Sequence, residues 1–166
     1  GGAGSEHDQA ALTYGSYLAL DEVLGAQRPR SDEHDEMLFI VVHQAYELWF
    51  KQMLWELDAV LRLFDRPHVD ERDVGRAGTH LGRVVAIQRV VIAQIDILET
   101  MTPLDFLDFR DALIPASGFQ SVQFRLIENR LGMRPQDRMR YSDAPYTSRL
   151  KPADARRIEA AEEERG

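Results

Sequence analysis

The sequence predicts an all-α protein, a bundle of long helices. Two long stretches carry apolar residues at three- and four-residue intervals, the spacing that places them on one face of a helix. Pro and Gly fall mainly between or at the edges of such stretches, and no segment shows the alternation of a strand or an internal repeat. With 166 residues, the chain has the length of one domain.

The composition excludes several classes of function. A net charge of −8 argues against a general nucleic-acid or anionic-membrane binder. The chain has no cysteine, which excludes disulfides, thiolate metal sites and thiol nucleophiles. No apolar run approaches the ~18 residues of a membrane span, and no signal-peptide pattern opens the sequence. We therefore expect a soluble cytoplasmic protein that binds neither nucleic acid nor membranes.

The N-terminal part begins with residues 1–11, expected to be a disordered arm or a tag remnant. The next segment, LTYGSYLALDEVLGAQ, predicts a short helix from its apolar residues, which are Leu18, Leu20, Val23 and Leu24. Tyr14 and Tyr17 flank Gly15-Ser16 at its start. Two roles for these tyrosines remain open: anchoring the arm on its own core, or reaching a neighbouring subunit.

The first long helix is predicted from His34 to Leu57, which contains neither Gly nor Pro, with Ser31 or Asp32 as its cap. One narrow arc of it holds Phe39, His43, Tyr46, Phe50 and Leu57. The opposite stripe is thinly polar, with Glu36, Gln44, Glu47 and Lys51. We expect such an apolar helix to be largely buried. His43 is then either a core histidine bonded to backbone or a neutral imidazole that faces an apolar ligand.

A second long helix is predicted from about Asp73 to Met101. Its apolar face would hold Leu81, Val84, Val85, Gln88, Val91, Ile92, Ile95 and Leu98. Thr102-Pro103 ends this helix and starts a short one, LDFLDFRDALI. A turn, PASGFQ, leads to a helix from about Phe119 to Leu131, with Gly132 as its C-terminal cap. Residues 133–148 are predicted to be loop. The polar helix at 151–166 has little apolar face and should continue into further structure, pack weakly or fray.

Arg110 is the most informative charge because it lies in a short apolar helix just before a Ser-Gly loop. A guanidinium there needs a partner, and a planar carboxylate fits its fork best. That carboxylate belongs either to a ligand or to Asp105 or Asp108. Ser117 and Gly118 in the loop could offer a hydroxyl and backbone N–H groups to a small ligand.

Metal and nucleophile motifs are missing from the sequence. A di-metal carboxylate bundle needs Glu-x-x-His on two helices, and the chain has no such motif. His43 and Glu47 lie one turn apart, but one such pair does not make a metal site. There is also no phosphate-binding Gly loop and no ordered Ser-His-Asp set. The residues alone therefore predict an aromatic pocket around His43, near Arg110.

Four long segments resemble tryptophan 2,3-dioxygenases, in that family's order and spacing over roughly residues 12–150. They are TYGSYLALDEVLGAQ, FIVVHQAYELWFKQMLWELD, LETMTPLDFLDFRDALIPASGFQS and QFRLIENRLG. The resemblance implies an all-helical homotetramer, a dimer of dimers, that uses haem b. It implies insertion of both atoms of O₂ into the indole 2,3-bond of L-tryptophan. The product is N-formylkynurenine, which begins the kynurenine pathway of tryptophan catabolism.

The resemblance also implies roles for single residues. His43 matches the distal, catalytic histidine that approaches the indole nitrogen, and Phe39 matches a ring that lines the indole pocket. Arg110 matches the arginine that pairs with the substrate carboxylate, and Leu113 a pocket-wall residue. The segment TYGSYL matches one that completes the pocket of a neighbouring subunit, through Tyr14, Tyr17 and Leu18.

On the cofactor side, the resemblance places Ser117 and the adjacent Gly118 near the haem. Phe106 and Phe124 fall where some members carry tyrosine, so we expect apolar contacts there.

Family members are considerably longer, and their proximal histidine, the iron ligand, lies in a C-terminal half to which no segment here corresponds. The loop that binds the substrate ammonium lies there too. The remaining histidines, His7, His34, His68 and His80, sit in no segment that resembles the ligand's helix. We therefore expect no metal ligand in this chain and expect that residues 12–150 are the N-terminal portion of the haem domain. The helix at 151–166 would lead to the missing half, on which activity depends.

Two alternatives remain open. One is a related haem-dependent enzyme that hydroxylates an aromatic amino acid, and the other is a truncated homologue that acts as an oligomerisation module. A product assay separates the hydroxylase, which would form a hydroxylated amino acid, from the dioxygenase, which would form N-formylkynurenine. An oligomerisation module would self-associate without binding haem, and substitution of Arg110 would not affect its function.

Overall fold

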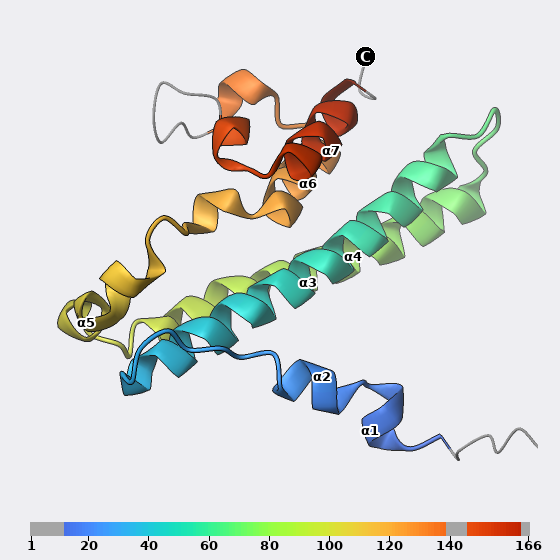
Figure 1. Cartoon of the computed structure of the whole chain (residues 1–166). Coiled ribbons are helices and arrows are strands. Elements are labelled where there is room, and N and C mark those ends of the chain that lie inside the picture. Colours follow the sequence, from blue (N-terminus) through green and yellow to red (C-terminus); the bar gives the residue numbers. More distant parts are fainter. Residues whose placement is uncertain (1–11, 139–145, 164–166) are drawn as a thin grey trace, which may run out of the picture.

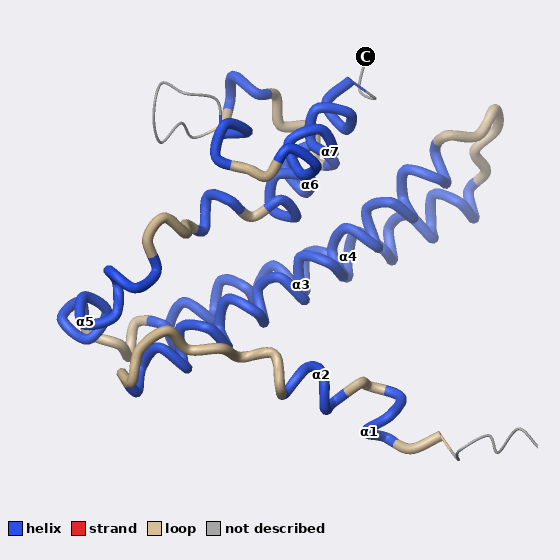
Figure 2. Tube along the Cα trace, viewed as in Figure 1, coloured by secondary structure: helices blue, strands red, loops and turns tan. Residues whose placement is uncertain are grey.

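The computed structural model describes residues 12–138 and 146–163. Its frame is a hairpin of two long antiparallel helices, α3 (His34–Phe64) and α4 (Glu71–Leu98) (Figure 1). The short helices α1 (Tyr14–Tyr17) and α2 (Leu20–Leu24) precede it and extend away from the body. α5 (Pro103–Leu113) lies at the open end of the hairpin, while α6 (Val122–Arg130) and α7 (Pro152–Glu163) pack together beside its middle. Figure 2 shows helices and loops without a strand in this described part, so the all-α prediction is confirmed.

Three short 3₁₀ turns complete the described part of the chain: η1 (Gly118–Gln120), η2 (Pro135–Asp137) and η3 (Tyr146–Arg149). The last two lie in the segment predicted to be loop. The helix predicted from Phe119 is split, because η1 ends before Ser121 starts α6. The predicted arm at residues 1–11 lies outside the described residues.

The start of α3 differs from the prediction. Neither Ser31 nor Asp32 caps it, and Glu33 stands at the N-cap without a side-chain bond. Instead Glu36, placed in the polar stripe by its spacing, is buried. Its carboxylate accepts hydrogen bonds at 2.7 Å from the N–H groups of Arg30 and Ser31 and at 2.5 Å from the Ser31 hydroxyl. Burial raises the pKa of Glu36, but these bonds outweigh it and the net pKa lies below the ordinary value.

The main core lies where α3, α4, α6 and α7 meet. It consists of Met53, Leu54, Leu57, Val84, Ile87, Leu126, Ile127, Ile158 and Ala161. The predicted apolar face of α4 is only partly correct. Val84 is buried as expected, but Leu81, Val85, Ile92 and Ile95 are exposed, and the unpredicted Ile87 is buried. The difference arises because several apolar positions of α4 lie next to its contact with α3 and not within it.

The expectation that α3 is largely buried is wrong for the described chain. Val41, Leu48 and Trp55 lie seven residues apart on one side of the helix, and Trp55 is 70% exposed. α3 contacts α4, α5 and α6, and these contacts leave Val41, Leu48 and Trp55 exposed. Considered with the exposed positions of α4, the hairpin presents apolar faces to its surroundings.

α7 packs more firmly than its polar sequence predicts. Ile158 is 0% exposed and Ala161 is buried, so two residues on one side suffice to join α7 to the core.

Other local predictions, which concern the ends of helices, are confirmed. Thr102 forms a capping box with Asp105 at the start of α5, and Gly132 follows α6 with a φ of 86°. Among the described helices, none combines the length and apolarity of a membrane span.

Candidate functional site

An aromatic cluster forms where α5 meets the first half of α3. The ring of Phe39 lies 4.1 Å from the imidazole of His43, between ring centroids, and 5.6 Å and 5.7 Å from the rings of Phe106 and Phe109. Tyr46 continues the row one turn further along α3, 6.1 Å from His43. The structure therefore joins three residues predicted for the site, Phe39, His43 and Phe106.

His43 has a defined hydrogen bond. Its Nδ1 lies 2.7 Å from the backbone carbonyl oxygen of Phe39, which can only accept. Nδ1 must therefore carry the proton, and in the neutral ring Nε2 keeps a lone pair that can accept a hydrogen bond. The two interpretations of His43 are combined: the histidine is held by backbone, and its half-buried ring also lines a cavity.

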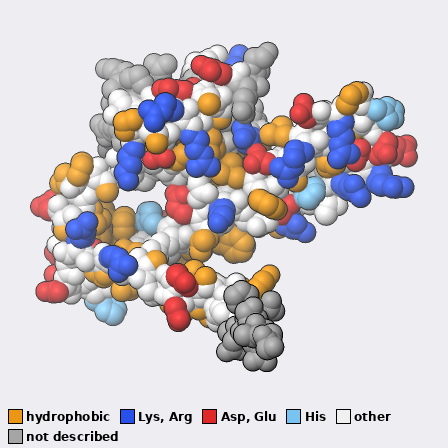
Figure 3. All heavy atoms as spheres, turned by 45° about the vertical axis from the view of Figure 1, so that its right-hand side comes forward, with side chains coloured by type: hydrophobic (Ala, Val, Ile, Leu, Met, Phe, Trp, Pro, Cys, Tyr) orange, Lys and Arg blue, Asp and Glu red, His pale blue; other side chains and the backbone are white. Residues whose placement is uncertain are grey.

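The cavity has a volume of about 730 Å³, within the roughly 300–1,000 Å³ of ligand sites. Its wall is largely apolar and comes mainly from α3, α4, η1 and α6, with the charged Arg125, Glu128 and Asp137 at other points of the lining. Tyr46, Phe50, Val91, Ile92, Ile95, Phe119 and Phe124 supply most of the apolar part of the lining. Figure 3 shows the molecule hollowed beside the hairpin, with hydrophobic side chains around it. Burial raises the pKa of Tyr46, so its phenol stays neutral.

Ser117 and Gly118 line the same cavity. Ser117 and Gln120 form a capping box around η1. The Ser117 hydroxyl accepts a hydrogen bond from the N–H of Phe119, and the side chain of Gln120 accepts one from the N–H of Ser117. A Cβ added to Gly118 would meet no heavy atom within 4 Å, so the space above this turn is open. An open glycine turn in a cavity with a largely apolar lining fits one face of a flat, apolar macrocycle such as haem b. Phe106, in contrast, packs against Phe39 and is not part of this wall.

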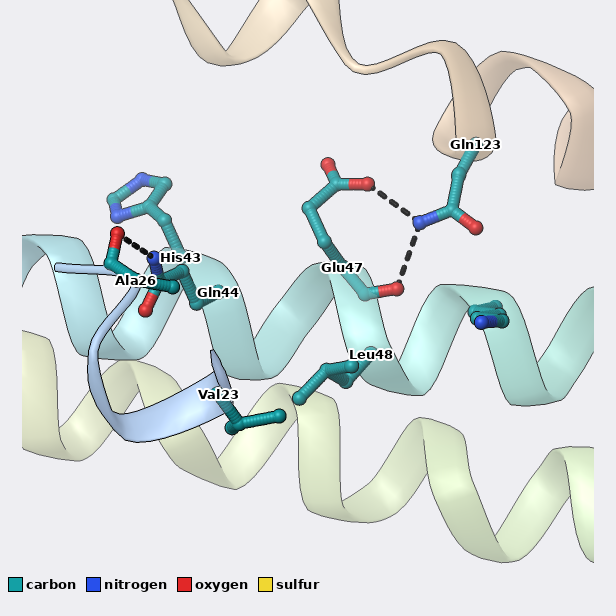
Figure 4. Close-up of a pocket in the computed structure, with 8 residues that line it drawn as sticks. Val23, Ala26, His43, Gln44, Glu47, Leu48 and Gln123 are labelled. Atoms are coloured by element: carbon teal, nitrogen blue, oxygen red, sulfur yellow. Dashed lines mark hydrogen bonds between the residues drawn. The ribbon is translucent and has the colours of Figure 1, made fainter. Parts of the chain in front are cut away.

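Glu47, one turn after His43, connects α3 to α6. Its carboxylate accepts hydrogen bonds from the Ser121 hydroxyl at 2.6 Å and from Nε2 of Gln123 at 2.8 Å. Glu47 lies in the predicted polar stripe, and nothing in the sequence pattern pairs it with residues 74 and 76 positions later. His43 and Glu47 project from the same side of α3, toward the segment that carries Gln123 (Figure 4).

Arg110 lies on the exposed side of α5, and within the described part of the chain it has no ion pair or hydrogen bond. The internal partners considered for it are not used. Asp105 instead accepts from the N–H and hydroxyl of Thr102, and these bonds hold the pKa of Asp105 below its ordinary value. Leu113, at the end of the same helix, is half-buried. The guanidinium is therefore available to a carboxylate from outside the chain.

The N-terminal tyrosines are not brought to the cavity of their own chain. Tyr14 is 77% and Tyr17 74% exposed, and Leu18 is also exposed. They lie on and just after α1, which a Thr13–Ser16 capping box stabilises and which points away from the hairpin (Figure 1).

The other described histidines lie elsewhere. His34 is exposed at the start of α3, His68 is exposed between α3 and α4, and Nδ1 of His80 bonds Glu56 at 2.5 Å. Across residues 12–138 and 146–163 there is no group of three or more His, Cys, Asp and Glu side chains that could hold a metal ion. His7 lies outside the described residues.

Comparison with known proteins agrees with these motifs. A sequence profile of the tryptophan 2,3-dioxygenase family matches residues 2–166. A tryptophan 2,3-dioxygenase of Bdellovibrio bacteriovorus is 56% identical over 142 residues, which cover 82% of this chain and 40% of that protein. The Dictyostelium discoideum enzyme of the same name is 48% identical over 161 residues, covering 94% of this chain and 40% of that one. The Xenopus tropicalis enzyme is 50% identical over 149 residues, 86% of this chain and 37% of its own length.

The chain thus spans about 40% of the length of the first of these relatives, while the matches cover most of the chain itself. A family profile over nearly every residue, together with relatives near 50% identity, is decisive. The chain belongs to the tryptophan 2,3-dioxygenase family.

Proposed function

We propose that this chain supplies the indole-binding wall of an enzyme that oxidises L-tryptophan with O₂ to N-formylkynurenine, the first step of the kynurenine pathway. The complete enzyme is this segment together with the rest of the family's length. The observation that carries the proposal is the state of His43. Its Nδ1–H is fixed on the Phe39 carbonyl, and its Nε2 remains an acceptor inside an aromatic-walled cavity.

The residues of the site match the parts of tryptophan. The indole ring is flat and apolar, and Phe39 beside His43 offers an aromatic surface of that kind. Nε2 of His43 would accept the indole N–H, which orients the ring without transferring a proton. Arg110, which lacks an internal partner in the described region, would bind the carboxylate, and Leu113 would close the pocket wall.

Haem b is the cofactor expected for the family, and when bound it supplies the activation of O₂. Ser117 and Gly118 would lie against it at the open turn, and Phe124 would contact its apolar surface. Phe106 would act indirectly by supporting Phe39. The axial iron ligand would come from outside this chain, because His34, His68 and His80 lie away from the cavity.

The complete enzyme is proposed to be a cytoplasmic homotetramer, a dimer of dimers. Two observations support an assembly: the exposed apolar line of Val41, Leu48 and Trp55 on α3, and the exposed Tyr14 and Tyr17 on α1. Apolar surface of this extent is typical of faces that another chain or segment covers. Tyr14, Tyr17 and Leu18 would complete the pocket of a neighbouring subunit.

Hemin titration followed by visible spectroscopy tests the cofactor part of the proposal. We expect a sharp Soret band that shifts with CO after reduction when hemin is added to the complete enzyme. We expect neither signal from this chain alone. A clean haem spectrum from this chain alone would show that one of its own histidines ligates the iron. That result would contradict the proposal that the iron ligand comes from outside this chain.

A further inference from the structure

Glu47 stands between two cavities. It lines the His43 cavity and also a second, smaller one of about 430 Å³, and His43 is the other residue that lines both. The second cavity lies between α3, the end of α2 and the start of α6 (Figure 4). The rest of its lining comes from Val23, Ala26, Gln44, Leu48, Lys51 and Gln123.

Glu47 uses all of its oxygens to hold the start of α6. Oε1 accepts from the Ser121 hydroxyl at 2.6 Å, and Oε2 accepts from Nε2 of Gln123 at 2.8 Å. The same Nε2 also donates to the backbone carbonyl of Glu47 at 2.7 Å. Figure 4 shows both Gln123 bonds crossing from α6 to α3. Hydrogen bonds to a charged acceptor are about twice as strong as neutral ones, which favours this carboxylate as an anchor.

The anchored segment is itself a continuous hydrogen-bonded unit. The Ser121 hydroxyl that donates to Glu47 also accepts from the N–H of Phe124 at 3.2 Å and so caps α6. Immediately before it, the box formed by Ser117 and Gln120 closes η1, and the N–H of Ser121 bonds the carbonyl of Gly118 at 3.1 Å. Hydrogen bonds therefore link Ser121 to the Ser117-Gly118 turn, which lines the same cavity as His43.

We propose that Glu47 is a positioning residue. Its bonds to Ser121 and Gln123 form a clamp that fixes the Ser117-Gly118 turn relative to His43 and maintains the wall between the two cavities. The inference rests on the proposed function, because the turn and His43 are the groups proposed to contact cofactor and indole. The competing interpretation is that Glu47 only stabilises the contact between α3 and α6.

The first measurement is hydrogen exchange by mass spectrometry on the complete enzyme carrying Glu47→Ala. Losing a charge-assisted bond of about 1.5 kcal/mol corresponds to roughly tenfold faster opening. We expect about tenfold faster exchange at residues 118–124 and unchanged exchange in α7. Glu159→Ala removes an exposed carboxylate of α7 and should change neither segment.

The second measurement separates positioning from simple anchoring. We expect Glu47→Ala to lower kcat about tenfold with a smaller change in KM, because Arg110 lies outside the clamp. Glu47→Gln keeps one side-chain oxygen as an acceptor and should recover most of the loss. If Glu47→Ala does not fold, Ser121→Ala and Gln123→Ala each remove one donor, and both should show a smaller effect in the same direction.

Each outcome is decisive. Unchanged exchange at residues 118–124 would overturn the clamp, and faster exchange with unchanged kcat would reduce Glu47 to an anchor and overturn its positioning role. The failure of the unsubstituted enzyme to form N-formylkynurenine would instead refute the proposed function. The exchange measurement would still test the clamp in that case.

Discussion

Nδ1 of His43 donates a hydrogen bond to the backbone carbonyl of Phe39 at 2.7 Å, while the two rings lie 4.1 Å apart between centroids. One helical turn thus fixes both the tautomer of the histidine and its distance from an aromatic neighbour. Nε2 is left as the ring atom that can accept a hydrogen bond in the cavity. This arrangement suits the recognition of an N–H group on an aromatic ligand.

His43→Ala should lower kcat/KM for tryptophan by about tenfold in the complete enzyme. A neutral hydrogen bond contributes about 0.5–1.5 kcal/mol, which is equivalent to roughly tenfold at most. Steady-state kinetics provides the measurement. A general base typically contributes about 10²–10⁴-fold, so a loss in that range would mean that His43 transfers a proton.

Arg110→Ala should weaken tryptophan binding by about 10–100-fold, since a hydrogen bond to a charged group is worth about 1.5–3 kcal/mol. Tryptamine has the same indole but no carboxylate, and its affinity should not change. Equilibrium titration of both ligands makes the comparison, with Arg156→Ala on the exposed side of α7 as a control. Equal losses for both ligands would show that Arg110 does not recognise the carboxylate.

Glu56 should make folding stability depend on acid pH. Burial raises its pKa, but hydrogen bonds from Arg83, His80 and Gln52 outweigh this effect, so the net pKa lies below the ordinary value. A carboxyl whose pKa is lower in the folded state stabilises the fold at neutral pH. That stability is lost as the pH falls from about 4.3 through the lowered pKa.

Urea unfolding of the complete enzyme as a function of pH measures this effect. Glu56→Gln should cost about 1–3 kcal/mol at neutral pH and flatten the acid branch of the stability curve. An acid branch unchanged by Glu56→Gln would assign the pH dependence to other carboxyls, such as Glu36, whose pKa is also lowered.

Ile158→Ala should destabilise the protein by about 2–5 kcal/mol, because Ile158 is 0% exposed in the core between α6 and α7. Ile97→Ala removes the same atoms from a side chain that is 50% exposed and should cost much less in thermal unfolding. Similar effects of the two substitutions would mean that α7 packs only weakly, as its polar sequence predicts.

Local patterns predicted the helices well. Periodicity located α3 and α4, and Thr102-Pro103 and Gly132 marked helix ends through their capping chemistry. Errors arose where a contact with a segment outside the helix determines whether a side chain is buried. Glu36 looks like a surface residue until the N–H groups of Arg30 and Ser31 close around it. Ile158 looks isolated until α6 covers it.

In the predicted site, too, local contacts could be predicted from the sequence and contacts between distant segments could not. The aromatic spacing on α3 correctly grouped Phe39 with His43, since that spacing is local. The link from Glu47 to Ser121 crosses 74 residues and has no sequence signal of its own. Whether Tyr14 and Tyr17 reach another subunit depends on a partner, and their exposure agrees with that proposal.

The identity of the product distinguishes a tryptophan dioxygenase from a hydroxylase of an aromatic amino acid. The complete enzyme, loaded with hemin and reduced, would be incubated with L-tryptophan under isotope-labelled O₂, and the product analysed by mass spectrometry. We expect N-formylkynurenine that carries two labelled oxygen atoms, and we expect Arg110→Ala to reduce its formation strongly. A hydroxylated amino acid with one labelled oxygen, or no product from a haem-loaded enzyme, would contradict the proposed function.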